Sequence, residues 1–218
     1  MSFQIICFDC DSTLSKIEGI DELAKRKGLG DELAKLTDAA MNGIVPLESV
    51  YKQRLDLIKP DRNSIEWLAD LYISEQVDGV ATVFSELIAQ DKQLHIISGG
   101  LRQAILPLAY RLGLTDQQVH AVDVYFNDDG SYLDYQQHSP LARNGGKAEI
   151  CRQLMAIDSN LAMIGDGNTD LEAMQAGAFM IGFGGVVERA IVRERANAYC
   201  SDSNLMSIMS LLQTRQPA

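Results

Sequence analysis

Four short apolar runs of the chain, at residues 5–8, 94–97, 161–164 and 179–181, lack polar alternation. Runs of this kind are typical of parallel strands that are buried on both faces of a sheet. Between them, apolar residues recur every three or four positions, which predicts amphipathic helices. The alternation of strands and helices predicts a doubly wound, Rossmann-like α/β core with a parallel sheet.

A small β-hairpin and several helices complete the predicted core. We expect the hairpin at residues 122–133, where two strand-like segments flank the acidic turn Asn127-Asp128-Asp129-Gly130. The expected helices of the core are residues 80–89, 101–112, 145–155, 186–195 and 205–212.

The segment between the first two strands has a different character. From residue 17 to about residue 77, apolar residues recur at helical spacing, and no convincing strand is present. Glycines and a proline interrupt this pattern and divide it into short predicted helices. We therefore expect a helical cap domain of residues 15–78, inserted into a core domain formed by residues 1–14 and 79–218.

The composition is that of an ordinary globular protein with a strongly negative surface. The 218 residues are 46% hydrophobic, and 19 Lys and Arg against 30 Asp and Glu give a formal net charge of −11. Such a surface repels nucleic acids and anionic membranes, so we expect neither as a partner. No apolar stretch is long enough to span a bilayer.

The cysteines indicate a reduced, cytoplasmic protein. Cys7, Cys10, Cys151 and Cys200 are accompanied by no recognisable signal peptide, so we expect free thiols. Cys7 and Cys10 form a C-x-x-C pair, but no second pair and no nearby histidine pair completes a zinc site.

Polar residues follow three of the predicted strands. They are Asp9 and Asp11, then Ser98, Gly99 and Gly100, and finally Asp166 and Asp170. The carboxyl ends of parallel strands meet at one edge of a sheet, so we expect these residues to share a crevice. Carboxylate oxygens are the ligands that Mg²⁺ prefers, whereas Ser98 and the glycine N–H groups can donate to a phosphate. Lys147, at the start of a predicted helix, adds a cation.

Each of these motifs also has a structural explanation, as a helix cap, a turn or a surface lysine. Their convergence on one edge of the sheet favours the functional interpretation. Other chemistries fit less well, because the sequence before Lys147 is not a Walker A loop. Ile96 stands where a hydrolase nucleophile elbow needs glycine. The three histidines, His95, His120 and His138, are scattered along the chain.

The order of these motifs resembles the haloacid dehalogenase superfamily of phosphotransferases. The motifs are Asp9-x-Asp11-x-Thr13, Ser98, Lys147 and Gly165-Asp166-Gly167-x-x-Asp170. Further stretches resemble the phosphoserine phosphatase family within it, and the similarity runs from about residue 8 to residue 202. These stretches are residues 18–24, 40–43, 51–55, 145–147 and 181–185.

The resemblance implies a role for each matching residue of the core. Asp9 would be the nucleophile and a Mg²⁺ ligand, and Asp11 the general acid/base, with its backbone carbonyl on the metal. Asp166 would be the third protein ligand, supported from behind by Asp170. Ser98 and Lys147 would hold the phosphoryl group that is transferred.

The resemblance also implies a substrate pocket in the cap. Glu18 would face the ammonium group of the substrate and Arg54 its carboxylate. The pocket would further be lined by Met41, Asn42, Gly99, Gly100 and Thr169. Asn42 and Asn168 depart from the family pattern, which has glycine and alanine there.

The activity implied is Mg²⁺-dependent hydrolysis of O-phosphoserine through an aspartyl phosphate, the last step of serine biosynthesis. Two alternatives remain open: a phosphatase or phosphotransferase of the same architecture acting on another small phosphomonoester, and a catalytically silent binding module. The intact acids at positions 9, 11, 166 and 170 argue against the silent module. The sequence leaves a monomer and a homodimer equally open.

Overall fold

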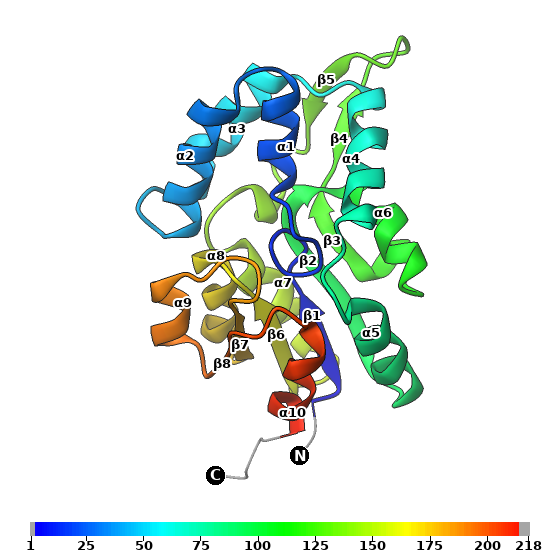
Figure 1. Ribbon diagram of the computed structural model, residues 1–218, viewed down its shortest axis with the longest axis vertical. Coiled ribbons are helices and arrows are strands. Elements are labelled where there is room, and N and C mark those ends of the chain that lie inside the picture. Colours follow the sequence, from blue (N-terminus) through cyan, green and yellow to red (C-terminus); the bar gives the residue numbers. More distant parts are fainter. Residues whose placement is uncertain (1–2, 214–218) are drawn as a thin grey trace.

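The computed structural model describes residues 3–213 of the chain, and its centre is a six-stranded parallel sheet in the order β3-β2-β1-β6-β7-β8 (Figure 1). The strands are β1 (Ile5–Phe8), β2 (Gln93–Leu101), β3 (Val119–Val122), β6 (Leu161–Gly165), β7 (Phe179–Phe183) and β8 (Ala198–Cys200). The chain winds outward from β1 in both directions, because β2 and β3 lie on one side of it and β6 to β8 on the other. The doubly wound α/β core is confirmed.

The sequence pattern missed the two edge strands, β3 and β8. Each is three or four residues long, and the half-buried side chains of His120 and Tyr199 interrupt their apolar pattern. An edge strand is not buried on both faces as a central strand is, so the continuous apolar signal is absent. Because Val122 belongs to β3, the first strand of the hairpin begins at Val124 instead of residue 122.

Helices cover both faces of the sheet. They are α5 (Val80–Ala89), α6 (Arg102–Arg111), α7 (Gly146–Met155), α8 (Asn168–Leu171), α9 (Ala190–Arg195) and α10 (Ile208–Gln213). The ring of Phe8 lies 4.8 Å from that of Phe84 in α5, whereas Cys7 points to the opposite face, towards Cys151 of α7. The helix predicted at 186–195 begins only at Ala190, because residues 186–189 form an irregular loop.

The segment between β1 and α5 is helical. Its helices are α1 (Gly19–Arg26), α2 (Gly30–Met41), α3 (Leu47–Ile58) and α4 (Arg62–Ser74). They lie with the hairpin of β4 (Val124–Phe126) and β5 (Tyr132–Tyr135) at the end of the molecule beyond the carboxyl ends of the strands (Figure 1). None of the described helices has both the length and the apolar character needed to cross a bilayer.

The helical segment leaves and rejoins the core at adjacent points. An antiparallel bridge pairs Ser15 with Gln76, and the N–H of Val77 donates to the carbonyl of Leu14 at 2.9 Å. In addition, α4 packs along core helix α6. The domain boundaries at residues 14/15 and 78/79 stay a prediction. The pairing of the two chain segments that connect the helices to the core supports them.

Candidate active site

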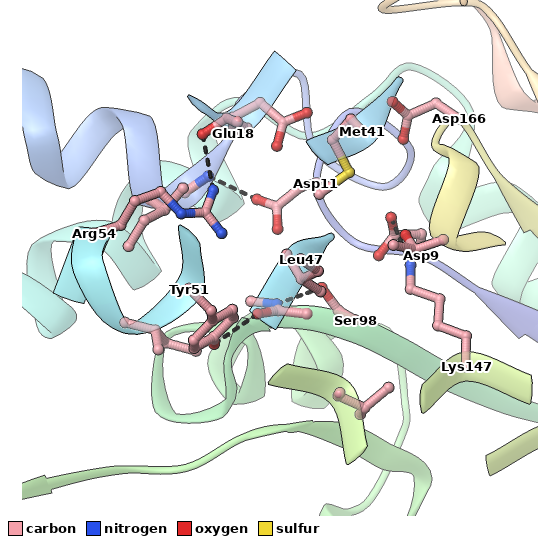
Figure 2. Close-up of a pocket in the computed structure, with 18 of the residues that line it drawn as sticks. Asp9, Asp11, Glu18, Met41, Leu47, Tyr51, Arg54, Ser98, Lys147 and Asp166 are labelled. Carbon is pink, nitrogen blue, oxygen red and sulfur yellow. Dashed lines mark hydrogen bonds and ion pairs between the residues drawn. The ribbon is translucent and has the colours of Figure 1, made fainter. Parts of the chain in front are cut away.

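The carboxyl ends of β1, β2 and β6 lie side by side. Phe8, the last residue of β1, is aligned with Ile96 of β2 and with Ile164 of β6. Asp9 and Asp166 therefore stand just beyond neighbouring strands, and Ser98 lies two residues past the aligned point in β2. The close-up in Figure 2 shows these side chains around one cavity.

Three buried carboxylates form a cluster at this edge. Ligand oxygens of Asp9, Asp166 and Asp170 all lie within 4.8 Å of one another. Burial and the charge of Asp9 raise the pKa of Asp166 to about 6, although the guanidinium of Arg189 acts in the opposite direction. Crowded carboxylates with raised pKa values gain most from a nearby cation. The all-oxygen donor set fits a hard divalent cation such as Mg²⁺.

The ammonium of Lys147 contacts two members of this cluster. Its Nζ lies 2.9 Å from Oδ2 of Asp9 and 2.5 Å from Oδ1 of Asp170. Burial alone would lower the pKa of Lys147, but the charges of Asp170 and Asp9 outweigh burial and raise it. Gly146 allows this approach, since a Cβ there would lie 1.9 Å from the carbonyl oxygen of Pro140. Lys147 therefore stays charged beside Asp9.

The carboxyl of Asp11 points away from the cluster, towards the helices of the cap. Its Oδ1 accepts hydrogen bonds from the N–H of Gly19 and the hydroxyl of Tyr72, both at 2.7 Å. Burial, followed by the charge of Asp9, raises the pKa of Asp11 to about 7 in spite of these hydrogen bonds. Asp11 can thus both give and take a proton near neutral pH.

Ser98 and two glycines form the floor of the cavity. The Ser98 hydroxyl oxygen accepts a 3.0 Å hydrogen bond from the N–H of Gly100. A Cβ on Gly100 would lie 3.0 Å from Oδ2 of Asp11, so this position favours glycine. The three residues continue β2, which extends to Leu101, and α6 begins only at Arg102. The helix predicted from residue 101 therefore begins one residue later, at Arg102.

Charged groups of opposite sign face the cavity from the cap. Oε1 of Glu18 accepts a 2.8 Å hydrogen bond from the hydroxyl of Ser12, and burial and the charge of Asp11 raise the pKa of Glu18. Arg54 is 3% exposed, and its guanidinium donates from Nη1 to Oγ1 of Thr37 at 2.9 Å. Its Nε has no hydrogen-bond partner in the part of the chain that the structure describes. A buried donor of this kind is costly unless a ligand satisfies it.

Most residues singled out from the sequence line this one cavity. They are Asp9, Asp11, Glu18, Met41, Arg54, Ser98, Gly99, Gly100, Lys147, Asp166 and Thr169. Asp170 lies behind Lys147 instead. Asn42 is not among the lining residues, because its side-chain amide turns back to donate to the carbonyl of Asp38 at 2.8 Å.

Sequence reasoning missed Arg189, which is buried beside the acidic cluster. Its Nε donates to Oδ2 of Asp166 at 3.2 Å, and its Nη atoms lie 3.5 Å from Glu18 and 3.4 Å from Asp38. It joins the core to the residue just before α1 and to α2, and it compensates part of the negative charge of the site. Arg189 stands in an irregular loop among other charged residues, so no local pattern distinguishes it.

Other lining residues were also missed because they resemble ordinary apolar positions of helices. Tyr72 and Tyr51 have the spacing of a buried helix face, yet both have hydroxyls that reach the site. The Tyr51 hydroxyl donates to the carbonyl of Gly99 at 2.8 Å and so joins α3 to the end of β2.

Comparison with known proteins gives consistent matches over nearly the whole chain. The family model of the haloacid dehalogenase-like hydrolases matches residues 3–177. The phosphoserine phosphatase of Drosophila melanogaster is 40% identical over 202 residues, which cover 91% of this chain and 75% of that protein. The human phosphoserine phosphatase is 36% identical over 203 residues, covering 92% and 90%.

Solved structures agree in fold. A phosphoserine phosphohydrolase-like protein from Francisella tularensis superposes with a TM-score of 0.86 at 25% identity, covering 95% of this chain and 99% of that one. A substrate-bound phosphoserine phosphatase superposes with a TM-score of 0.83 at 24% identity, covering 97% and 99%. The second likeness shows the shared fold.

Proposed function

The chain belongs to the haloacid dehalogenase-like hydrolases, and from this premise we propose that it is a phosphoserine phosphatase with Asp9 as its nucleophile. Its substrate would be O-phosphoserine, and its products serine and phosphate. The observation that carries this proposal is the buried Nε of Arg54, which has no hydrogen-bond partner among the described residues and belongs to a side chain that lines the same cavity as Asp9 and Glu18. On one small molecule, a carboxylate would face Arg54, an ammonium would face Glu18 and a phosphate would face Asp9.

Asp9 is held ready for attack on phosphorus. Its Oδ1 accepts a 2.8 Å hydrogen bond from the N–H of Cys10, and its Oδ2 contacts Lys147. An oxygen of Asp9 forms a bond to phosphorus while the bond from phosphorus to the serine oxygen breaks. Ser98 and Lys147 hold the phosphoryl oxygens, and the charge of Lys147 stabilises the negative charge of the transition state.

Asp11 moves the protons in both half-reactions. In its protonated form it gives a proton to the departing serine oxygen, and the resulting carboxylate then takes a proton from the attacking water. That water displaces Asp9 and releases phosphate. The pKa of about 7 makes both forms of Asp11 accessible at neutral pH.

We further propose that Mg²⁺ is the cation of the acidic cluster, held by Asp9, Asp166 and the backbone carbonyl of Asp11, with Asp170 supporting Lys147. When bound, Mg²⁺ would supply positive charge to the phosphoryl oxygens. Three mutually close carboxylates with only oxygen donors support this choice. From the cap, Glu18 would bind the substrate ammonium and Arg54 its carboxylate, beside Met41 and Thr169.

Phosphate release from a panel of phosphorylated amino acids and sugars, with and without a chelator, tests the function. We expect O-phosphoserine to be the preferred substrate by a wide margin and the chelator to stop its turnover. Preference for a sugar phosphate would overturn the substrate and leave only a phosphomonoesterase. No release from any substrate would overturn the enzyme itself and favour the binding module.

A further inference from the structure

Two histidines that are distant in sequence are paired in space, away from the cavity. Nδ1 of His95 in β2 lies 3.2 Å from Nε2 of His120 in β3. His120 is aligned with Ile97, two residues beyond His95, so both side chains leave the sheet on the same face. His95 is also aligned with Cys7, which places the pair on the face that carries α7.

The distance between the two nitrogens suits a shared metal ion. Two imidazole nitrogens that each lie about 2.0–2.1 Å from a tetrahedral Zn²⁺ are about 3.3 Å apart. The ring centroids lie 5.3 Å apart, with 32° between the ring planes. The rings therefore face one another through these nitrogens and do not stack. Both rings are half-buried, so their positions are restrained and one side remains open to solvent.

The two imidazoles are neutral in the folded protein. Burial lowers the pKa of His95. Burial, together with the neighbouring His95 and Arg102, lowers the pKa of His120 to about 4. Neutral imidazole is the form that binds metal ions, so no ring has to lose a net proton at pH 7. In the hydrogen-bonded pair, one of the two facing nitrogens carries a proton. When a metal ion binds, this proton moves to the other nitrogen of the same ring, so that both facing nitrogens have a free lone pair.

We propose that His95 and His120 form a two-histidine site for a divalent transition-metal ion of the Zn²⁺ and Cu²⁺ class, separate from the acidic cluster. Imidazole nitrogen suits these ions, whereas Mg²⁺ selects oxygen. Among the described residues, no His, Cys, Asp or Glu joins the pair as a third close donor, so water would fill the remaining positions. This proposal is independent of the phosphatase activity.

The charges around the pair permit a cation. Arg102 is the nearby positive group, but its guanidinium lies 3.8 Å from Asp123 and 4.0 Å from Asp116. These carboxylates compensate its charge. A bound ion would join β2 to β3 at the edge of the sheet and would stabilise the fold, because it binds only where both strands are in register.

Copper binding followed by electron paramagnetic resonance tests the site. One equivalent of Cu²⁺ is added to Mg²⁺-saturated protein, so that the acidic cluster is already occupied. Hyperfine coupling of Cu²⁺ to nitrogen then reports binding by imidazole. The exposed His138 is removed first, in the variant His138→Gln, which leaves only His95 and His120. We expect coupling to two nitrogens in this variant. Its absence would overturn the proposal and leave the pair as a simple hydrogen bond.

Two further variants assign the ligands. His95→Asn and His120→Gln, each made in the His138→Gln background, keep an amide near the position of the facing nitrogen, and neither residue lines the cavity. Loss of a partner behind a metal ligand already weakens binding about 10–100-fold. We therefore expect each variant to bind Cu²⁺ at least about tenfold more weakly than His138→Gln and to lose the two-nitrogen signal. Retention of both properties would overturn the assignment. Circular dichroism and unchanged phosphate release from O-phosphoserine check that each variant is folded.

Discussion

The hydroxyl of Tyr72 donates a 2.7 Å hydrogen bond to Oδ1 of Asp11, so a helix of the cap directly contacts the loop that follows β1. Tyr72 is fully buried near the end of α4, and Asp11 lies between the acidic cluster and the cap. This contact orients the carboxyl group that we propose as the acid and base. It also links the position of the cap to the geometry of the reaction.

Tyr72→Phe should reduce kcat/KM for O-phosphoserine by about tenfold, because a hydrogen bond to an ionisable group is worth about 1.5–3 kcal/mol. Phenylalanine keeps the ring packing, so the variant should remain folded. Tyr110→Phe is the matched control, since it removes an exposed hydrogen bond between a tyrosine and Asp116. Equal activities of the two variants would show that the Tyr72 contact is not needed for catalysis.

Asp9→Asn should abolish turnover and preserve the fold. The amide cannot form an acyl phosphate, and losing a nucleophile costs several orders of magnitude. Phosphate release measures the loss, and beryllium fluoride should label the wild-type protein at Asp9 only. Asp78→Asn, an exposed position, serves as the control. If Asp9→Asn kept a tenth of the wild-type rate, covalent catalysis at this residue would be wrong.

Removal of divalent cations should stop the reaction, and Mg²⁺ should restore it while Ca²⁺ does not. Asp9 is both a proposed ligand and the nucleophile, and Ca²⁺ accepts both oxygens of one carboxylate more readily than Mg²⁺ does. It would thereby leave no oxygen of Asp9 free to attack. Chelation followed by addition of each ion is the measurement, and full activity with Ca²⁺ alone would contradict the scheme.

The sequence was sufficient to predict the convergence of strand ends, because long apolar runs identify central strands and parallel strands share an edge. Asp9 and Asp166 follow from that rule alone. Arg189 does not, since it reaches the site from an irregular loop and only the three-dimensional fold brings it near. The pairing of His95 with His120 was also missed, because β3 is an edge strand without an apolar run. Asn42, the turn residue directly after α2, was expected in the pocket, but its side-chain amide turns back to Asp38 and does not line the cavity.

Asp61 should stabilise the helical segment between β1 and α5, because it is the N-terminal capping residue of α4. Its Oδ1 accepts hydrogen bonds from the N–H of Ser64 at 2.8 Å and from the Ser64 hydroxyl at 2.6 Å. These bonds lower the pKa of Asp61 in the folded protein. Asp61→Ala should therefore lower the free energy of unfolding by about 1 kcal/mol at pH 7, measured with urea. Asp70→Ala, exposed on the same helix, should change it little.

The effect of Asp61 should also depend on pH. Because the folded pKa is below the unfolded value, the ionised form stabilises the fold above the unfolded pKa of about 3.9. That contribution is lost as the pH falls through the lowered folded pKa. The difference between wild type and Asp61→Ala should therefore shrink at strongly acidic pH. A constant difference would mean that the charge of Asp61 has no part in capping.

Substrate choice provides the sharpest test of the cavity, through Arg54. Its guanidinium is buried, with Nη1 bonded to Thr37 and Nε left without a partner among the described residues. A planar guanidinium can bind both oxygens of a carboxylate at once, which is the group that distinguishes phosphoserine from a simple phosphomonoester. Arg54→Ala should lower kcat/KM for O-phosphoserine about a hundredfold or more, on the order of 3 kcal/mol for a lost charge-assisted pair.

The same variant should hydrolyse p-nitrophenyl phosphate nearly as well as wild type does, because that substrate has no carboxylate for Arg54 to bind. Binding energy from the carboxylate also helps to align the phosphoryl group with Asp9, so kcat for O-phosphoserine should fall as KM rises. Arg152→Ala, an exposed arginine of α7, should leave both substrates unaffected. Equal losses on both substrates would make Arg54 a structural residue, since a buried guanidinium that only supports packing cannot distinguish substrates by their carboxylate.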